Sequence, residues 1–213
     1  MLGFLHTAAV HVDTFERLLR ERDAALPSRH VVAAGLLDAA RAAGGVTPAI
    51  AADVAAALRA LVGDGARVLL CTCSTIGAAA EAAAVGVPVL RLDRPMAEQA
   101  VASGSRIALV AALASTLAPS AALLHEVAAR AGRHVTVTDV PCAEAWPHFE
   151  VGALEAYYDA VAVAAERAAA SHDVVVLAQG SMAPAAARVR SAVPVLSSPR
   201  LGVEAALRLY RTA

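Results

Sequence analysis

Cys73 is the residue in this chain whose type and position most favour chemistry. It follows an apolar run, Val68–Cys71, and precedes Ser74, Thr75 and an alanine-rich stretch of helical length. A thiol at a strand-to-helix turn lies near backbone N–H groups without helical partners, which favour the thiolate and can hold a carboxylate. A thiolate beside a bound carboxylate is well placed to remove a proton from the adjacent carbon. The alternative for this position is a buried, unreactive cysteine.

The other two cysteines carry weaker signals. Cys71 lies on the same predicted strand two residues before Cys73, which favours a structural thiol, and a metal pair of the two would need scattered histidines to complete it. Cys142 follows a different strand, between Pro141 and Ala143. Three cysteines without a Cys-x-x-Cys pair indicate neither a disulfide framework nor a metal motif, so we expect free thiols and no metal.

The elements that must position Cys73 are visible as an alternation along the chain. Short β-branched runs bounded by turn residues alternate with alanine-rich stretches, which is typical of βα units and predicts an α/β fold with mainly parallel sheets. The predicted strands are Leu2–His6, His30–Ala33, Arg67–Thr72, Val87–Arg91, Arg106–Ala111, His134–Val140, Asp173–Ala178 and Val193–Leu196. The predicted helices are Asp13–Leu26, Thr47–Val62, Gly77–Val85, Pro95–Ser103, Leu117–Ala131, Gly152–Ala170, Met182–Val189 and Leu201–Arg211.

An internal repeat organises these units. Val68–Ala100 and Val174–Ala206 align without a gap, and both contain an apolar strand, a small polar turn, a helix and the string Val-Pro-Val-Leu. Any two βα units share part of this pattern, but the string and the arginines at 94 and 200 fall at one constant offset. The repeat predicts two similar lobes related by a pseudo-twofold axis, residues 1–95 plus 197–213 and residues 96–196.

Duplicated α/β lobes bind ligands at the carboxyl ends of their strands. The pseudo-twofold would bring the turns Thr72–Thr75 and Ala178–Ser181 to the two sides of one cleft, so that position 73 faces position 179. Arg94 and Arg200 follow the fourth strand of each half, where an arginine either binds an anion or begins a solvated helix. The residues that we expect to contact substrate in the cleft are His6, Thr7, Ser74, Thr75, Ser115, Thr116, Gln179, Gly180 and Ser181.

The run Val68–Gly77 resembles the first catalytic-cysteine turn of the aspartate/glutamate racemase superfamily, in which a strand ends in a cysteine followed by small hydroxyl or amide residues. The resemblance extends over most of the chain, including the duplicated lobes, the turn Ala114–Thr116 and the closing Pro194–Leu196. The superfamily includes aspartate, glutamate and hydantoin racemases, maleate isomerase and arylmalonate decarboxylase. The resemblance implies cofactor-free proton transfer next to a carboxylate or carbonyl, with cysteines in a cleft between the lobes.

The chain departs from the two-cysteine pattern of the racemases in this superfamily. Where the second cysteine is expected it has Gln179, Gly180 and Ser181, and a glutamine cannot act as a base at neutral pH. The resemblance therefore implies a racemase-, isomerase- or decarboxylase-type enzyme that uses Cys73 alone as acid, base or nucleophile. A non-catalytic protein that binds small carboxylates is the alternative. Relatives commonly dimerise, so a homodimer is also implied.

Composition limits the partners. Hydrophobic residues make up 58% of the 213 residues, mostly as alanine and valine. The formal net charge is −1, and the charged residues are scattered singly along the chain, so we expect neither nucleic acid nor an anionic membrane as a partner. The N-terminal segment lacks a basic region before its apolar residues and does not resemble a signal peptide, which predicts a cytoplasmic protein. The uncharged run from Ile107 to Leu124 carries polar residues and Pro119, so we predict a strand, a turn and a helix start there.

Overall fold

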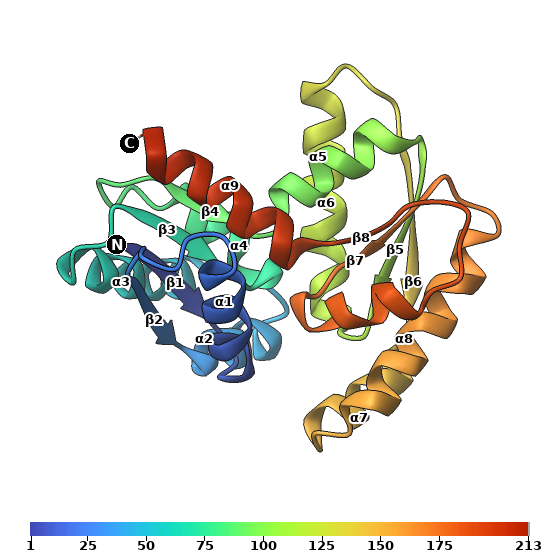
Figure 1. The fold of residues 1–213 in the computed structure, drawn as a ribbon, viewed down its shortest axis with the longest axis horizontal. Coiled ribbons are helices and arrows are strands. Elements are labelled where there is room, and N and C mark those ends of the chain that lie inside the picture. The colour runs from blue at the N-terminus through green and yellow to red at the C-terminus, as the bar shows by residue number, and fades with distance from the viewer. Residues whose placement is uncertain (213) are drawn as a thin grey trace. The chain divides into compact units, whose positions relative to one another are not determined.

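The computed structural model describes residues 1–212, which divide into two compact units. The first unit contains Met1–Asp93 and the chain from Pro199 onward, and the second contains Arg94–Ser198. Each unit is built on a four-stranded parallel sheet with helices packed against it (Figure 1). The borders lie within two residues of the lobe boundaries expected from the repeat.

The first sheet has the strand order β2-β1-β3-β4, and all its pairings are parallel. Its carboxyl ends therefore meet at one edge, where Leu5 of β1 pairs with Cys71 of β3 and Cys71 pairs with Arg91 of β4. The two central strands are buried along their whole length, as expected for a sheet covered on both faces. The strands are β1 (Leu2–His6), β2 (Ser28–Val32), β3 (Val68–Cys71) and β4 (Val89–Arg91).

Helices cover both faces of the first sheet. Successive side chains of a strand point to opposite faces, so Phe4 packs with Phe15 of α1 and Val203 of α9, whereas Leu5 packs with Val54 of α3 and Ile76 of α4. These two apolar clusters hold the strand that leads to Cys73 from both sides. The helices are α1 (Val10–Arg20), α2 (Ala34–Ala42), α3 (Pro48–Gly63), α4 (Ser74–Ala82) and α9 (Ser198–Thr212).

The second unit repeats the strand order of the first as β6-β5-β7-β8, again with parallel pairings only. One core of this unit joins Tyr157 and Val161 of α8 to Ala108, Val110 and Val175 of the sheet. The strands are β5 (Arg106–Ala111), β6 (Thr136–Pro141), β7 (Val174–Leu177) and β8 (Val195–Ser197). The helices are α5 (Arg94–Ser103), α6 (Ala114–Arg130), α7 (Trp146–Glu150) and α8 (Leu154–Ala169), with the 3-10 helices η1 (Ala143–Ala145) and η2 (Gly180–Arg188).

The α/β class, the two similar lobes and all eight predicted strands are confirmed, whereas several helices differ from the predicted ones. α4 begins at Ser74 and α6 at Ala114, three residues before the predicted starts, because polar residues fit a first turn whose N–H groups lack helical partners. The predicted helix after β7 is a 3-10 helix with Pro184 inside it, where a proline removes a backbone donor. α2, η1 and α7 were not predicted; α2 has one buried residue, Ala40, and α7 has none, so neither gives a clear helical periodicity. α1 ends at Arg20, six residues before the predicted end at Leu26.

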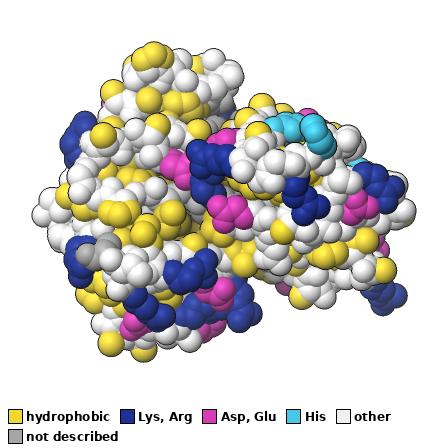
Figure 2. Space-filling model, turned by 90° about the horizontal axis from the view of Figure 1, so that it is seen from above, with side chains coloured by type: hydrophobic (Ala, Val, Ile, Leu, Met, Phe, Trp, Pro, Cys, Tyr) yellow, Lys and Arg dark blue, Asp and Glu magenta, His cyan; other side chains and the backbone are white. Residues whose placement is uncertain are grey.

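The surface of the protein mixes both signs of charge. All 18 basic residues are arginines, and arginine and acidic side chains are interspersed on the face shown in Figure 2. Within residues 1–212, no helix combines the length and apolar character that a membrane-spanning segment requires. Over the same residues, no three His, Cys, Asp or Glu side chains gather in a way that could hold a metal ion.

Candidate functional site

Cys73 lies at the carboxyl edge of the first sheet, between β3 and α4. The backbone N–H of Thr72 still donates to the carbonyl of Leu5, and Cys73 then takes the N-cap position of α4 in an extended conformation. The Cys73 side chain makes no capping hydrogen bond and is half-buried. Only Thr72 and Cys73 separate β3 from α4, so the thiol lies at the N-terminus of a helix, next to the partial positive charge of the helix dipole.

Burial separates Cys73 from the other two thiols. Cys71 is fully buried, and loss of hydration raises the pKa of its thiol far above the ordinary range, with a further contribution from Cys73. Burial also raises the pKa of Cys142, to about 12, with Glu144 adding to the effect. Thiols with such pKa values stay protonated and unreactive near neutral pH. The interpretation of Cys71 as a structural thiol agrees with this geometry.

His6 ends β1 beside the Cys73 turn, but both of its ring nitrogens already have protein partners. Nδ1 lies 2.8 Å from the Thr72 hydroxyl oxygen and Nε2 lies 2.9 Å from His30 Nδ1. The ring is fully buried, and burial together with His30 and His11 lowers the pKa of His6 to about 3. His6 is therefore a neutral residue that supports the turn, and the geometry gives it no free ring nitrogen for the substrate contact that we expected. Thr7, the next residue, is also buried.

A buried ion pair at the end of β4 was missed by the sequence reasoning, which drew attention to Arg94 instead. Arg91 makes a two-pronged contact with Asp93 at 2.7 and 2.9 Å, and both side chains are almost completely buried. The Arg91 side chain lies against α4, because a Cβ on Gly77 would come within 3.2 to 3.4 Å of it. Arginine and aspartate two residues apart after a strand share one face, which is the signal that could have identified this pair.

Gln179 occupies a defined place in the second unit. It follows β7, and its side-chain oxygen accepts hydrogen bonds from the backbone N–H groups of Ala112 at 2.7 Å and Leu113 at 3.0 Å, in the turn before α6. Gly180 begins the 3-10 helix η2 directly after it. The side-chain oxygen of Gln179 thus occupies two backbone N–H groups that could otherwise donate to an oxygen of a substrate. Gln179 joins the turn after β7 to the turn after β5 and offers neither an acid nor a base.

The hydroxyl residues expected to bind substrate in the second unit are largely turned inward. Ser181 lies 2.8 Å from the hydroxyl of Tyr157, whose ring is fully buried. Thr116 is buried in the first turn of α6, and the Ser115 oxygen is shielded from solvent. With Gln179, these residues follow the carboxyl ends of β5 and β7, and the side chains of Gln179 and Ser181 have protein partners there.

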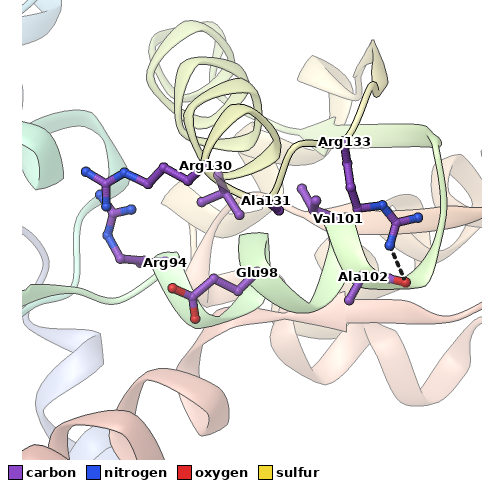
Figure 3. Close-up of a pocket in the computed structure, with 8 residues that line it drawn as sticks. Arg94, Glu98, Val101, Ala102, Arg130, Ala131 and Arg133 are labelled. Atoms are coloured by element: carbon purple, nitrogen blue, oxygen red, sulfur yellow. Dashed lines mark hydrogen bonds between the residues drawn. The ribbon is translucent and has the colours of Figure 1, made fainter.

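A separate pocket in the second unit lies between α5 and α6, and arginines line it (Figure 3). It has a volume of about 340 Å³, and Val101 and Ala131 give it an apolar wall. Arg94, expected either to bind an anion or to begin a helix, contacts Glu126 at 3.3 Å, and Arg130 reaches the same carboxylate at 2.9 Å. Two of the arginines that line this pocket thus share one carboxylate, and the third, Arg133, donates to the carbonyl of Ala102 at 3.0 Å.

Arg200, the counterpart of Arg94 in the repeat, lies on α9. It is exposed and forms an ion pair with Glu204 at 3.3 Å, one helical turn further along. An exposed pair of this kind contributes little to stability. Its geometry is that of a solvated helix start rather than of an anion site.

The comparisons with known proteins agree with this architecture. No protein-family model and no curated protein matches the chain. Solved structures do: aspartate racemase from Picrophilus torridus has a TM-score of 0.71 at 14% identity, covering 98% of this chain and 92% of that one. Glutamate racemase from Bacillus anthracis has a TM-score of 0.67 at 16% identity, covering 100% and 82%. A glycine-to-cysteine mutant of arylmalonate decarboxylase has a TM-score of 0.58 at 22% identity, covering 98% and 92%.

These likenesses establish the fold of the chain. Racemase structures match over its whole length with a TM-score well above 0.5, so the two-lobed α/β fold is that of the aspartate/glutamate racemases. The resemblance expected from the Cys73 turn and the internal repeat is thereby confirmed at the level of the fold.

Proposed function

We propose that this chain is a cofactor-independent enzyme of the aspartate/glutamate racemase type, which acts next to the carboxylate of a small molecule through Cys73 alone. The observation that carries the proposal is the contrast among the thiols: Cys73 is half-buried at a helix N-terminus, whereas Cys71 and Cys142 are fully buried. The racemase fold supports the same class of chemistry.

The proposed reaction begins with the Cys73 thiolate. Its sulfur takes the proton from the carbon next to the substrate carboxylate, and the electron pair of the broken C–H bond is delocalised into that carboxylate. The N–H groups of the first turn of α4, with Ser74 and Thr75, would bind the carboxylate and stabilise its added charge. The new S–H group then returns its proton to the same carbon. In a decarboxylation, Cys73 would instead begin as the neutral thiol: the C–C bond to CO2 breaks, the S–H group protonates the resulting carbanion, and the thiolate left behind regains a proton from solvent.

Gln179 limits which of these reactions fits. Racemisation by two acid/base groups needs a second group on the opposite face of the substrate, and an amide does not supply one near neutral pH. We therefore favour one-sided proton exchange, isomerisation or decarboxylation over a two-cysteine racemase reaction. The proposal keeps the expectations of a cytosolic homodimer that requires no cofactor and binds neither nucleic acid nor membranes.

A receptor for small carboxylates is the second candidate. The hydrogen bonds from the N–H groups of Ala112 and Leu113 to Gln179 favour this candidate, because they leave the turn after β7 without a catalytic acid or base. In that case Cys73 would line the binding site without taking part in a reaction.

Proton NMR in deuterated water separates the two candidates. A panel of amino acids, hydantoins, maleate and substituted malonates is incubated with wild type and with Cys73→Ser. The enzyme hypothesis predicts exchange, isomerisation or decarboxylation of at least one compound, lost in the variant. Binding of a compound without any turnover, and unchanged in Cys73→Ala, would establish the receptor instead. Turnover that survives in Cys73→Ser would refute the role of the thiol.

A further inference from the structure

A continuous row of hydrogen bonds crosses the first unit behind the Cys73 turn. It begins at the Thr72 hydroxyl, 2.8 Å from His6 Nδ1, and continues from His6 Nε2 to His30 Nδ1 over 2.9 Å. His30 Nε2 then lies 3.1 Å from a carboxylate oxygen of Glu16. We call these four residues the histidine relay. Since each imidazole contacts a partner at both nitrogens, each ring can receive a proton on one side while it releases one on the other.

With both rings neutral and Glu16 ionised, the hydrogen bonds have one consistent direction. His30 donates from Nε2 to the Glu16 carboxylate, so His30 Nδ1 carries no proton and accepts one from His6 Nε2. His6 Nδ1 must then accept from the Thr72 hydroxyl. Every donor in the row points towards Glu16.

One additional proton reverses the inner half of the row. If His30 carries protons on both nitrogens, it donates to Glu16 and also to His6 Nε2, so the proton of His6 lies on Nδ1. Thr72 now accepts from His6, and its own hydroxyl proton is free to donate to the Leu5 carbonyl, 3.2 Å away. The proton count rises by one, the charge lies on His30 beside the Glu16 carboxylate, and His6 remains neutral in both arrangements.

The row leads from the interior towards solvent. His6 is fully buried, whereas the side chain of His30 is 12% exposed and that of Glu16 is 29% exposed. The aromatic rings hold the inner end in place: His6 stacks on His30 with centroids 5.2 Å apart, and Phe4 stacks on His30 at 4.6 Å. A proton in this row can therefore exchange with solvent at the end formed by Glu16.

Charged and titratable neighbours keep Glu16 ionised and His6 neutral. Hydrogen bonds from Ser28 at 2.5 Å and from Arg20 at 2.7 Å, together with His30, lower the pKa of Glu16 to about 2. The titratable groups that act on His6 are His30 and His11, and both disfavour a charge on its ring. His30 is the ring that has the carboxylate partner.

We propose that Thr72, His6, His30 and Glu16 form a proton relay that links the turn carrying Cys73 with solvent and holds the relayed proton on His30 against Glu16. Its use in catalysis rests on the proposed function. One-cysteine chemistry needs a route by which the proton at the Cys73 turn exchanges with solvent while substrate covers the thiol. The relay would supply it at Thr72, the residue before Cys73, because a proton accepted by the Thr72 hydroxyl is matched by one passed from His6 to His30.

The two directions of the row have different signatures in long-range proton–nitrogen NMR of protein labelled with ¹⁵N-histidine. Across pH 5 to 9, the relay predicts that His6 changes from the Nε2–H to the Nδ1–H tautomer as His30 gains its proton, with one shared midpoint. A His6 tautomer that stays constant across this range overturns the relay. This readout needs no substrate, so it can fail while Cys73-dependent turnover stands, and the converse also holds.

Thr72→Val tests the inner end, because it keeps the β-branched shape and removes the hydroxyl. The neutral arrangement then loses one hydrogen bond, from Thr72 to His6, whereas the protonated arrangement loses two, from His6 to Thr72 and from Thr72 to the Leu5 carbonyl. The midpoint of His30 is therefore expected to fall in this variant. Thr138→Val, the same change at an exposed position of β6, is the matched control and leaves the midpoint unchanged. If turnover is found, its pH profile should shift with the midpoint in Thr72→Val. Equal midpoints in Thr72→Val and wild type would overturn the proposal.

Discussion

His6 makes the first unit sensitive to acid. Burial lowers its pKa from 6.5 to about 3, so the unfolded chain takes up a proton at His6 where the folded chain does not. Stability from this residue is therefore complete above pH 6.5 and is lost as the pH falls from 6.5 towards 3. Each pH unit in that window corresponds to about 1.4 kcal/mol, which gives a total of about 5 kcal/mol.

The part of this stability that is lost at pH 5 can be measured while the protein stays folded. The pKa of His6 in the unfolded chain, 6.5, lies about 1.5 units above pH 5. The free energy of opening of the first unit should therefore be about 2 kcal/mol lower at pH 5 than at pH 8. Because the folded pKa lies well below 5, this figure depends almost entirely on the unfolded value. His11, whose pKa burial also lowers, adds to the slope, so a variant at His6 is needed to isolate the effect.

Hydrogen exchange followed by mass spectrometry provides the assay. Peptides from β1 and β3 report the first unit, and peptides from β5 provide an internal reference in the second. In His6→Asn, which has no titrating ring at this position, the pH dependence of protection in β1 and β3 should be smaller than in wild type by about 2 kcal/mol between pH 8 and pH 5. Equal pH dependence in the two proteins would refute the reasoning.

Three further outcomes follow from the contacts of the site. Iodoacetamide should modify one thiol of the native protein, Cys73, and reach the two buried thiols after unfolding; labelling of two or three native thiols would contradict their burial. Gly77→Ala should destabilise the protein by about 1 kcal/mol in urea unfolding, because the new Cβ crowds Arg91, whereas Gly63→Ala in α3 has open space and should be neutral or stabilising. Gln179→Ala should cost about 1 to 3 kcal/mol in urea unfolding followed by the fluorescence of the single tryptophan, because two backbone N–H groups lose their acceptor; an unchanged midpoint would contradict this role.

The fold was predictable because its signals are local. The run Val68–Cys71 is apolar over its whole length, which suits a strand buried on both faces, and its counterpart Val174–Leu177 recurs in the repeat. The same strand order in the two sheets is the structural expression of that repeat. Helix starts were less accurate, since the first turn of α4 carries polar residues that also suit a loop.

The candidate site was predictable only where its geometry is local. Cys73 follows from a strand, a turn and a helix in succession. The partners of His6 and Gln179 do not, because His30 lies 24 residues from His6 and Ala112 lies 67 residues from Gln179, and sequence spacing does not encode which side chains meet across a sheet. Both residues were therefore expected to contact a ligand, and the structure instead gives them protein partners.

The configuration of the product formed in deuterated water tests the central claim most directly. With any compound of the panel that reacts at a carbon next to a carboxylate, a single acid/base thiol predicts deuterium on one face only. Chiral chromatography with mass detection should then find one labelled enantiomer with wild type and none with Cys73→Ser. A racemic labelled product would mean that a second group acts on the opposite face, and the account of single-cysteine chemistry would be wrong.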